Sequence, residues 1–563
     1  MTLLDLQKKL KKAKYDGFLI SRNNLFLEQD IRDDENIIQQ LTDFTGSAGT
    51  ILITEDKNYL FVDGRYELQA PAQTQKHAIE VICTTHISIQ NWLQQHMSGK
   101  KIGYNPWCWS ITEIAHFSTL KMIADADFVP TMLSSETPTI YAYDLAYCGQ
   151  SREEKVVSFA QYIKDQGFDA FFISSADSIS WLLNLRSDAL SNTPVFRAMA
   201  LIDTHCHVWI FSVPHKNKDE KINLPFLSLD DLPDRFKKFR KKTIGADYSN
   251  TSSAIYTLAE EYHIQLINKP DILQQQKAIK NICELKNIRT AHLYDGIALC
   301  KFLYWLDNNW QGKTELDIVE KLHEFRTKQP HFVSESFATI AAAGSNGAIV
   351  HYAPSSKTNK KLEANTLLLL DSGAQYLEGT TDITRTIPLG VIPPQMCEDY
   401  TLVLKSHIAL SKTVFPQNTT GARLDAIARQ PLWQEGKNYN HGTGHGVGCF
   451  LNVHEGPQYI SASCSLPFSS RQITSIEPGY YLENQYGIRI ENLVEICPAQ
   501  YKGFLKFKNL TLVPIDLRAI NKYLLSAEEI SWLNTYHQEV FATISPHLTS
   551  PEKEWLKTAC APL

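Results

Sequence analysis

The segment from Leu367 to Leu389 constrains the fold of this chain more than any other. Its sequence, LLLLDSGAQYLEGTTDITRTIPL, places Asp371 directly after four leucines and Asp382 before a run that alternates polar and β-branched residues. The pattern predicts a β-hairpin that turns near Gly379. Cross-strand neighbours lie roughly 5 Å apart, so two carboxylates are expected close together among apolar side chains, paired directly or diagonally. Such a pair requires a raised pKa or a bound cation.

Length and composition describe a large globular protein. The chain has 563 residues, and we expect about three or four domains. The net charge of −6 offers no basic surface, so we expect no binding to nucleic acid or membranes. No apolar run is long enough to span a membrane, and the basic N-terminal segment lacks the apolar core of a signal peptide. The eleven scattered cysteines argue against a disulfide framework and favour a reducing, cytoplasmic setting.

The first half of the chain contains a repeated pattern. Helical spacing, a strand and a hairpin occur over 3–62 and again over 156–211. The segments 15–21 and 168–174 are identical at four of seven positions. We therefore predict two related α/β domains in tandem, over 1–140 and 141–276, with a boundary in the polar, proline-bearing run 130–138.

The remaining region, 277–563, has a different character. Long helices, expected over 272–289 and 291–306, alternate with the strand pairs that hold the acidic residues. The capping box that begins at Ser526 predicts a last helix near the C-terminus. We predict a third domain with a C-terminal extension.

Further motifs add one histidine and two acids to the hairpin aspartates. Glycines surround His445 in the run HGTGHGVG, Glu477 precedes a Pro-Gly turn, and Glu491 ends an alternating strand. Taken singly, each has an ordinary explanation as a turn residue, a surface acid or a hydrogen-bonded loop histidine. Together, four carboxylates and one imidazole supply ligands for two divalent cations, whose charges they balance. An oxygen-rich set with one nitrogen favours Mn²⁺, with Co²⁺, Fe²⁺ and Zn²⁺ as alternatives.

These segments resemble the pita-bread metallopeptidase family, and in particular the long, three-domain, cytosolic aminopeptidase P (Xaa-Pro aminopeptidase) family. The likeness rests on DSGAQYLEGTTDITRT, HGTGHGVGCFLNVHEGP and EPGYYLENQYGIRIENLV, and extends through GSAGT, VDGRYELQA, NGAIVHYAP and LTLVPID to nearly the whole chain. It implies a mixed α/β (α+β) fold, with two tandem creatinase-like N-terminal domains before a pita-bread catalytic domain. It also implies hydrolysis of the bond before proline in second position, with release of the first amino acid.

The resemblance implies a role for individual residues. The implied metal ligands are Asp371, Asp382, His445, Glu477 and Glu491, with Asp382 and Glu491 bridging two metals. A bridging hydroxide would be the nucleophile and Glu477 the general base, while His351 and His454 stabilise developing oxyanion charge. The implied substrate-binding residues are Arg65, His351, His445 and His454. His441 and Arg489 are expected to orient ligands by hydrogen bonds.

Several alternatives remain open at the level of sequence. Prolidase shares the metal ligands but prefers dipeptides, and a non-catalytic peptide-binding module has the same fold without them. Creatinase also has this fold but lacks the metals. A nucleotide-binding glycine loop over 442–448 is disfavoured, because the run lacks the lysine of a phosphate-binding loop. His351 and His454 have an ordinary alternative as structural histidines, and Arg65 as a solvated turn residue. The resemblance implies a homodimer with Trp433 near a contact region, although a buried core tryptophan is an equal alternative.

Overall fold

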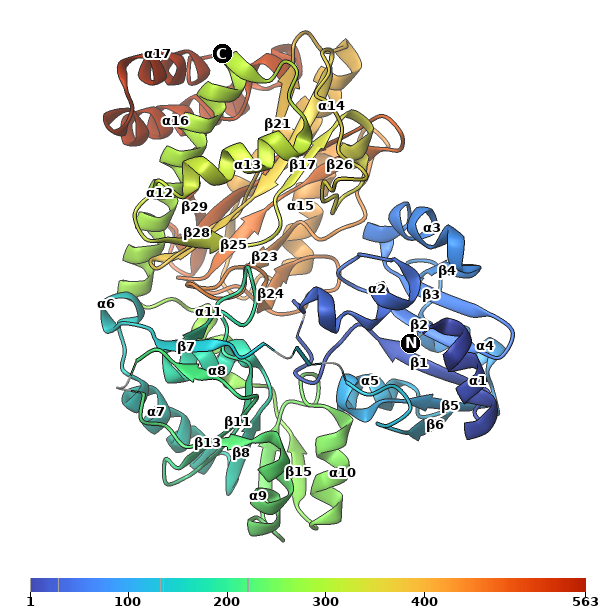
Figure 1. Ribbon diagram of the computed structural model, residues 1–563. Helices are drawn as coiled ribbons and strands as arrows, with labels where there is room; N and C mark the ends of the chain where they lie inside the picture. The colour runs from blue at the N-terminus through green and yellow to red at the C-terminus, as the bar shows by residue number, and fades with distance from the viewer. Residues whose placement is uncertain (1, 29, 132, 135, 220–221) are drawn as a thin grey trace. The chain divides into compact units, whose positions relative to one another are not determined.

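The computed structural model describes residues 2–28, 30–131, 133–134, 136–219 and 222–563. The chain forms two compact units: the first contains the residues up to Leu190 together with Pro194–Leu273, and the second contains Ser191–Thr193 and Gln274–Leu563. Figure 1 colours the first unit from blue to green and the second from green to red. Within the boundary region 130–138, residues 132 and 135 lie outside the described residues.

The first unit contains two six-stranded sheets with the same topology. The first sheet has the order β4-β3-β2-β1-β5-β6 and the second the order β13-β11-β10-β8-β14-β15. In both, the central strand pairs antiparallel with one strand of a hairpin on one side and parallel with a single strand on the other, and that strand pairs parallel with the edge strand. The predicted tandem repeat is therefore confirmed at the level of fold.

The strands of the two sheets are β1 (Gly17–Ser21), β2 (Thr50–Thr54), β3 (Asn58–Val62), β4 (Ile79–Cys83), β5 (Lys101–Tyr104) and β6 (Lys121–Ala124), and then β8 (Ala170–Ile173), β10 (Ala198–Asp203), β11 (Val208–Ser212), β13 (Phe226–Ser228), β14 (Thr243–Ala246) and β15 (Gln265–Asn268). A small sheet adds β7 (Thr139–Ala142), β9 (Leu185–Ser187) and β12 (Lys216–Asn217). The helices are α1 (Leu3–Ala13), α2 (Ile37–Thr42), α3 (Gln69–Thr74), α4 (Ile89–His96), α5 (Ile111–His116), α6 (Leu145–Cys148), α7 (Arg152–Asp165), α8 (Ala176–Leu183), α9 (Leu232–Lys238) and α10 (Ser253–Glu261).

Two of the identical positions in the repeat have the same structural task in each copy. Asp16 accepts a hydrogen bond from the backbone N–H of Lys101 at 2.7 Å, and Asp169 accepts one from Thr243 at 2.9 Å. Each carboxylate thereby fixes the start of the parallel neighbour strand. The phenylalanine two residues further on packs where that neighbour has a glycine, which leaves room for the ring.

Two sheets of the second unit are each backed by a pair of helices. One sheet has the order β17-β18-β21, and the other has the order β22-β29-β28-β25-β23-β24. Helices α12 (Ile282–Asn309) and α13 (Glu315–Arg326) cover the first sheet through a buried apolar cluster, while α14 (Pro394–Ser411) and α15 (Gly421–Trp433) cover the second. Figure 1 shows these strands running between the two helix pairs.

The strands of the second unit are β16 (Phe332–Glu335), β17 (Ile340–Ala343), β18 (Thr366–Ser372), β19 (Ala374–Tyr376), β20 (Gly379–Thr380), β21 (Ile383–Leu389), β22 (Val414–Pro416), β23 (Gly444–Gly446), β24 (Glu455–Ile460), β25 (Ile473–Ile476), β26 (Gly479–Leu482), β27 (Tyr486–Arg489), β28 (Asn492–Pro498) and β29 (Phe504–Asn509). The remaining helices are α11 (Ile272–Ala278), α16 (Ala527–Ile544) and α17 (Ser550–Ala559).

The predicted hairpin forms, but its tip belongs to another sheet. Strands β18 and β21 pair antiparallel, whereas β19 and β20 at the tip join β16 in a separate three-stranded sheet. Asp371 lies opposite Thr384, so Asp382, two residues before Thr384, is its diagonal neighbour on the same face. The register that the sequence left open is therefore the diagonal one.

One predicted helix is wrong. The expected continuous helix over 272–289 is interrupted after α11, and α12 begins afresh with Asn281 as its N-cap in a capping box with Glu284. The helix predicted after Ser526 is confirmed, because Ser526 and Glu529 form a capping box at the start of α16.

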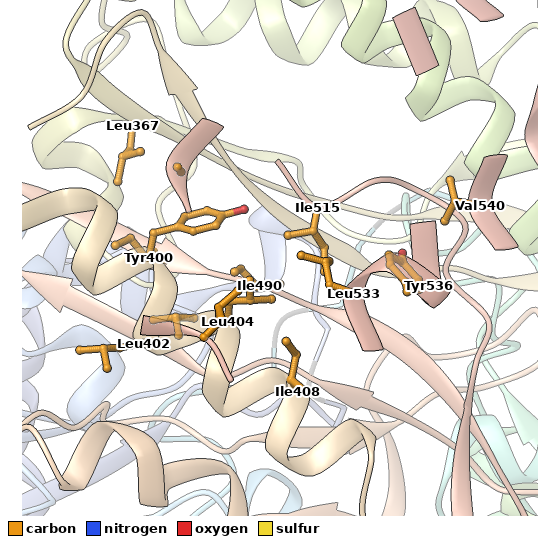
Figure 2. Close-up of a cluster of buried hydrophobic side chains, with 14 of the residues drawn as sticks. Leu367, Tyr400, Leu402, Leu404, Ile408, Ile490, Ile515, Leu533, Tyr536 and Val540 are labelled. Atoms are coloured by element: carbon orange, nitrogen blue, oxygen red, sulfur yellow. The ribbon is translucent and has the colours of Figure 1, made fainter. Parts of the chain in front are cut away.

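The C-terminal helix α16 completes a core of the second unit. Figure 2 shows Tyr400, Leu404 and Ile408 of α14 facing a cluster that includes Leu533 and Val540 of α16. These side chains are buried, and each large apolar side chain that leaves water contributes about 1.5–3 kcal/mol. The C-terminal extension is thus part of the unit that holds the acidic residues.

Candidate metal centre

The five predicted metal ligands lie at strand ends of the second unit. Asp371 is the penultimate residue of β18, Asp382 immediately precedes β21, and His445 is the middle residue of β23. Glu477 follows β25, and Glu491 lies between β27 and β28. Two sheets and the short hairpin β26–β27 therefore contribute side chains to one place.

The side chains converge around the His445 ring. Its Nε2 lies 3.4 Å from Asp382 Oδ2 and 3.5 Å from Glu477 Oε1. One ligand atom each of Asp382, His445 and Glu491 lies within 4.8 Å of the others. His445 Nδ1–H donates to the Gly446 carbonyl at 2.9 Å, which leaves Nε2 directed at the acids.

Protein groups balance only part of the negative charge of this cluster, since, of the described acids, Arg489 pairs with Asp371 alone. Burial, and then repulsion from Asp371 and Glu477, raises the pKa of Asp382 well above its usual range. Burial and repulsion from Asp382 likewise raise the pKa of Glu491, and burial raises that of Glu477. Among the described residues, the buried Asp371 Oδ1 and Glu491 Oε1 have no hydrogen-bond partner. Unsatisfied buried carboxylate oxygens around an imidazole fit two divalent cations.

Surrounding hydrogen bonds orient the acids. Arg489 Nη2 donates to Asp371 at 2.6 Å, Thr384 Oγ1 to Glu491 at 2.8 Å, and Ser475 Oγ to Glu477 at 3.2 Å. The sequence had pointed to Arg489 but not to Thr384 or Ser475. Thr384 was within reach of sequence reasoning, because strand alternation places it two residues from Asp382 on the same face.

His441 is connected to the centre through two intermediate residues. Its Nε2 accepts a hydrogen bond from Tyr481 Oη at 2.8 Å, and Tyr481 in turn accepts one from Arg489 Nη1 at 2.7 Å. The path from His441 to Asp371 therefore runs through Tyr481 and Arg489. Sequence reasoning missed Tyr481. It is a neutral residue in the segment EPGYYLENQY, and neither its charge nor its spacing from other residues indicates a role.

The glycines beside His445 permit close approach of neighbouring backbone. A Cβ on Gly444 would lie 2.0 Å from the Ser475 carbonyl oxygen, and a Cβ on Gly446 would lie 2.2 Å from the Glu455 carbonyl oxygen. Strand β23 is thereby held tightly between β24 and β25. This packing gives the alternating glycine pattern a physical cause.

The remaining predicted site residues differ in their surroundings. The half-buried His454 ring lies edge-on to His445, with centroids 4.3 Å apart. His351 is half-buried in the loop before β18, next to Val350, whose carbonyl accepts from Arg489 at 3.4 Å. Arg65 belongs to the first unit, where it forms a two-pronged ion pair with Asp63 at 2.9 and 2.8 Å. A substrate role for Arg65 stays a prediction.

Two other groups of side chains of the types that can bind a metal ion lie close together in the described part of the chain. They are Glu67 with Cys83 and His86, and Asp203 with His205 and His207, and both include exposed members. The group around His445 differs because all three members are buried. Within the described ranges, no helix is both long and apolar enough to cross a membrane.

Comparison with protein families identifies every part of this architecture. Residues 286–498 match metallopeptidase family M24, and 503–563 match the C-terminal region of peptidase M24. Residues 3–133 and 131–284 each match a creatinase/prolidase N-terminal domain.

Individual relatives are similar over the full length. A probable Xaa-Pro aminopeptidase P from Coprinopsis cinerea is 34% identical, covering 100% of this chain and 98% of the relative. Aminopeptidase P1 from Lotus japonicus is 32% identical, with 92% and 93% covered. The X-prolyl aminopeptidase structure from Caenorhabditis elegans, described as a cytosolic enzyme with a di-nuclear active site, covers 100% of both chains at 30% identity and a TM-score of 0.94. A prolidase structure from Pyrococcus horikoshii covers only 65% of this chain, with a TM-score of 0.52.

The two creatinase-like domains, the pita-bread unit with its buried acids, and full-length relatives at this level of identity lead to one conclusion: the chain belongs to metallopeptidase family M24, in its aminopeptidase P group, and is a peptidase hydrolase.

Proposed function

We propose that the protein hydrolyses the peptide bond before a proline in second position and releases the first amino acid. The observation that carries this proposal is the set of four carboxylates and one histidine, all positions filled and buried except for the half-buried Glu477, in a chain similar over its full length to X-prolyl aminopeptidases. The filled set argues against a non-catalytic peptide-binding module, since that module lacks the ligands.

Asp371, Asp382, His445, Glu477 and Glu491 would hold two divalent metal ions, for which we propose Mn²⁺. When bound, such ions polarise a scissile carbonyl and lower the pKa of water. The fit rests on the donor set and on the unsatisfied oxygens of Asp371 and Glu491. The di-nuclear centre described for the C. elegans enzyme supports the number of ions.

Glu477 is the proposed general base. Burial raises the pKa of its carboxyl above the ordinary value, and a carboxylate with a raised pKa is better matched to taking and returning a proton near neutral pH. The Ser475 hydroxyl holds one oxygen in place. The Glu477 side chain is the least buried of the four acids, at 18% exposed against 12% for Asp371. This greater exposure suits a general base that exchanges a proton with water.

His454 and His351 are proposed to donate hydrogen bonds to the substrate carbonyl as negative charge develops there. The contact between the His454 and His445 rings supports a place for His454 beside the reacting groups. A proline after the scissile bond provides no N–H and has a fixed φ, so its recognition depends on shape rather than on backbone pairing.

We also propose a cytoplasmic homodimer. The cytoplasm is supported by the C. elegans relative, which is described as cytosolic. Trp433, at the end of α15, is 49% exposed. That exposure excludes the alternative of a buried core tryptophan and supports its predicted place near a dimer contact. Sedimentation of wild type against Trp433→Ala tests the assembly.

The activity is tested with purified, metal-stripped protein. Xaa-Pro-Pro tripeptides and Xaa-Pro dipeptides are assayed after Mn²⁺, Co²⁺ or Zn²⁺ is restored in turn. We expect release of the first residue from tripeptides, restored most strongly by Mn²⁺. Cleavage of dipeptides alone would assign the protein as a prolidase, and no cleavage with metal bound would overturn the proposal.

A further inference from the structure

A buried ionic cluster lies directly beside the proposed site, outside the metal ligands. Glu455, the residue after His454, forms ion pairs with Lys280 and with Lys277, the latter at 3.1 Å. All three side chains are at most 1% exposed. Lys280 Nζ also donates to the Lys277 carbonyl at 2.8 Å. Burying three charges is costly, and removing one partner of a buried ion pair is strongly destabilising.

The cluster connects both strands that flank His445. Glu455 is the first residue of β24 and lies opposite Gly446 of β23. The backbone N–H of Lys280 donates to the Arg471 carbonyl at 3.0 Å, just before β25, which leads to Glu477. Because β23 lies between β24 and β25, the segment that carries Lys280 joins the two neighbours of the strand that holds His445.

The Glu455 carboxylate also packs against the glycine run. A Cβ on Gly448 would lie 3.1 Å from Glu455 Oε2. The Gly448 N–H donates to the Asn452 carbonyl at 2.9 Å and closes the loop that leads to His454. The start of this loop therefore lies close to the Glu455 carboxylate, and His454, at its end, immediately precedes Glu455 in the chain.

We propose that Lys277, Lys280 and Glu455 form a positioning clamp that holds the His454 ring against His445 in the productive orientation. The clamp acts through His454 and touches no reacting atom. This inference rests on the proposed role of His454 in the hydrolysis of Xaa-Pro peptides. It also explains why the chain leaves helical structure between α11 and α12, where Lys280 turns inward to reach Glu455.

The decisive experiment is a double-mutant cycle between Lys280→Met and His454→Ala, measured on an Xaa-Pro-Pro peptide with Mn²⁺ bound. We expect Lys280→Met alone to lower kcat about 10- to 100-fold, as misplacement of one catalytic group does, with KM changed less than about threefold. In the His454→Ala background the same substitution should change kcat less than about threefold. Full additivity would overturn the clamp, whereas an unaffected kcat in His454→Ala alone would overturn the proposed role of His454.

Two controls separate positioning from stability. Lys405→Met removes another ion pair of this unit, with Glu529 at 2.8 Å, and should leave kcat unchanged. The triple variant K277M/K280M/E455M replaces the whole cluster by apolar groups and avoids an unpaired buried charge. It should fold and bind two metals but show the same loss of kcat, and Lys280→Arg should recover most of it. A triple variant with wild-type kcat would contradict the clamp.

A readout without substrate makes the test independent of the activity. Hydrogen exchange of peptides that cover 447–456 should be faster in Lys280→Met than in wild type, while exchange in β18 and β21 stays the same. Unchanged exchange over 447–456 would overturn the proposal even if the protein cleaves no Xaa-Pro peptide.

Discussion

At the scale of single residues, Glu477 offers the sharpest test of the proposed chemistry. Glu477→Gln keeps the shape and one oxygen but cannot accept a proton, so kcat on an Xaa-Pro-Pro peptide should fall about 10²–10⁴-fold. Metal content, measured by elemental analysis, shows whether the variant still binds two ions. A kcat within tenfold of wild type in a metal-loaded variant would exclude Glu477 as the base.

His537 makes a second prediction, concerning stability. Its Nε2 accepts the Ile515 N–H at 3.0 Å, and burial lowers its pKa to about 4. The unfolded chain, with a histidine pKa near 6.5, binds this proton first, so the second unit loses stability as pH falls from about 6.5 to 4. From pH 7 to pH 5 the loss is about 2 kcal/mol.

Urea unfolding at both pH values measures this effect. His537→Gln can still accept the Ile515 N–H but does not titrate, so its loss between pH 7 and pH 5 should be smaller by about 2 kcal/mol. His547, which is exposed, provides the control His547→Gln, with the pH dependence of wild type. Equal pH dependence in His537→Gln and wild type would refute the assignment.

At the scale of elements, sequence patterns predicted those helices and strands whose formation depends on interactions between residues near in sequence. The repeated α/β domains, the paired strands β18 and β21 and the helix after Ser526 follow from alternation, helical spacing and capping, which act over a few residues. The tip of the hairpin escaped prediction because its partner strand β16 lies about forty residues earlier, a separation no periodicity reveals. The break at Lys280 escaped because a buried ion pair with Glu455 overrides helix propensity there.

The same contrast applies to the site. Residue types and motif resemblance pointed to the four acids and one histidine of the proposed metal centre, because their chemistry is unusual among apolar strands. Neutral partners such as Ser475 and Tyr481 are common residues whose importance arises only from distances in the folded chain. Their roles could not be predicted without the structure.

The glycine run around His445 permits a matched test at this scale. A Cβ at Gly444 would meet the Ser475 carbonyl at 2.0 Å, whereas a Cβ at Gly442 would have its nearest neighbours at an ordinary 3.6 Å. Gly444→Ala should therefore destabilise the second unit by about 1–3 kcal/mol or more and weaken metal binding, because β23 must move away from β25. Gly442→Ala should behave like wild type; equal effects of the two substitutions would contradict the packing account.

At the scale of the whole molecule, the C-terminal extension is tied to the centre through one buried arginine. Arg385 of β21 donates to the Glu491 carbonyl at 2.6 Å and to Tyr536 Oη of α16 at 2.9 Å. Together with the core in Figure 2, these bonds make the last helices part of the support of the ligand-bearing strands.

The two units have separate cores, so the molecule should respond to metal removal in one part only. The proposed ions bind the folded second unit and offset repulsion among its buried carboxylates. At a free metal concentration 100-fold above Kd, one site contributes about 2.7 kcal/mol, which corresponds to roughly 5 °C or more in Tm for a unit of this size. Calorimetry should therefore show two transitions, of which only the one assigned to the second unit shifts on chelation.

For Asp382→Asn, we expect the order of stability of variant and wild type to reverse when metal is added. Without metal, the variant should be more stable than wild type, because it removes a buried charge whose pKa is raised by burial and by Asp371 and Glu477. With Mn²⁺ present the order should reverse, because wild type gains the binding free energy and the variant gains little. Unfolding of both proteins, measured at pH 7 with EDTA and with Mn²⁺, tests the two expected orders of stability. If the variant is the less stable protein under both conditions, Asp382 serves the packing of its strand and not the charge balance of a metal centre.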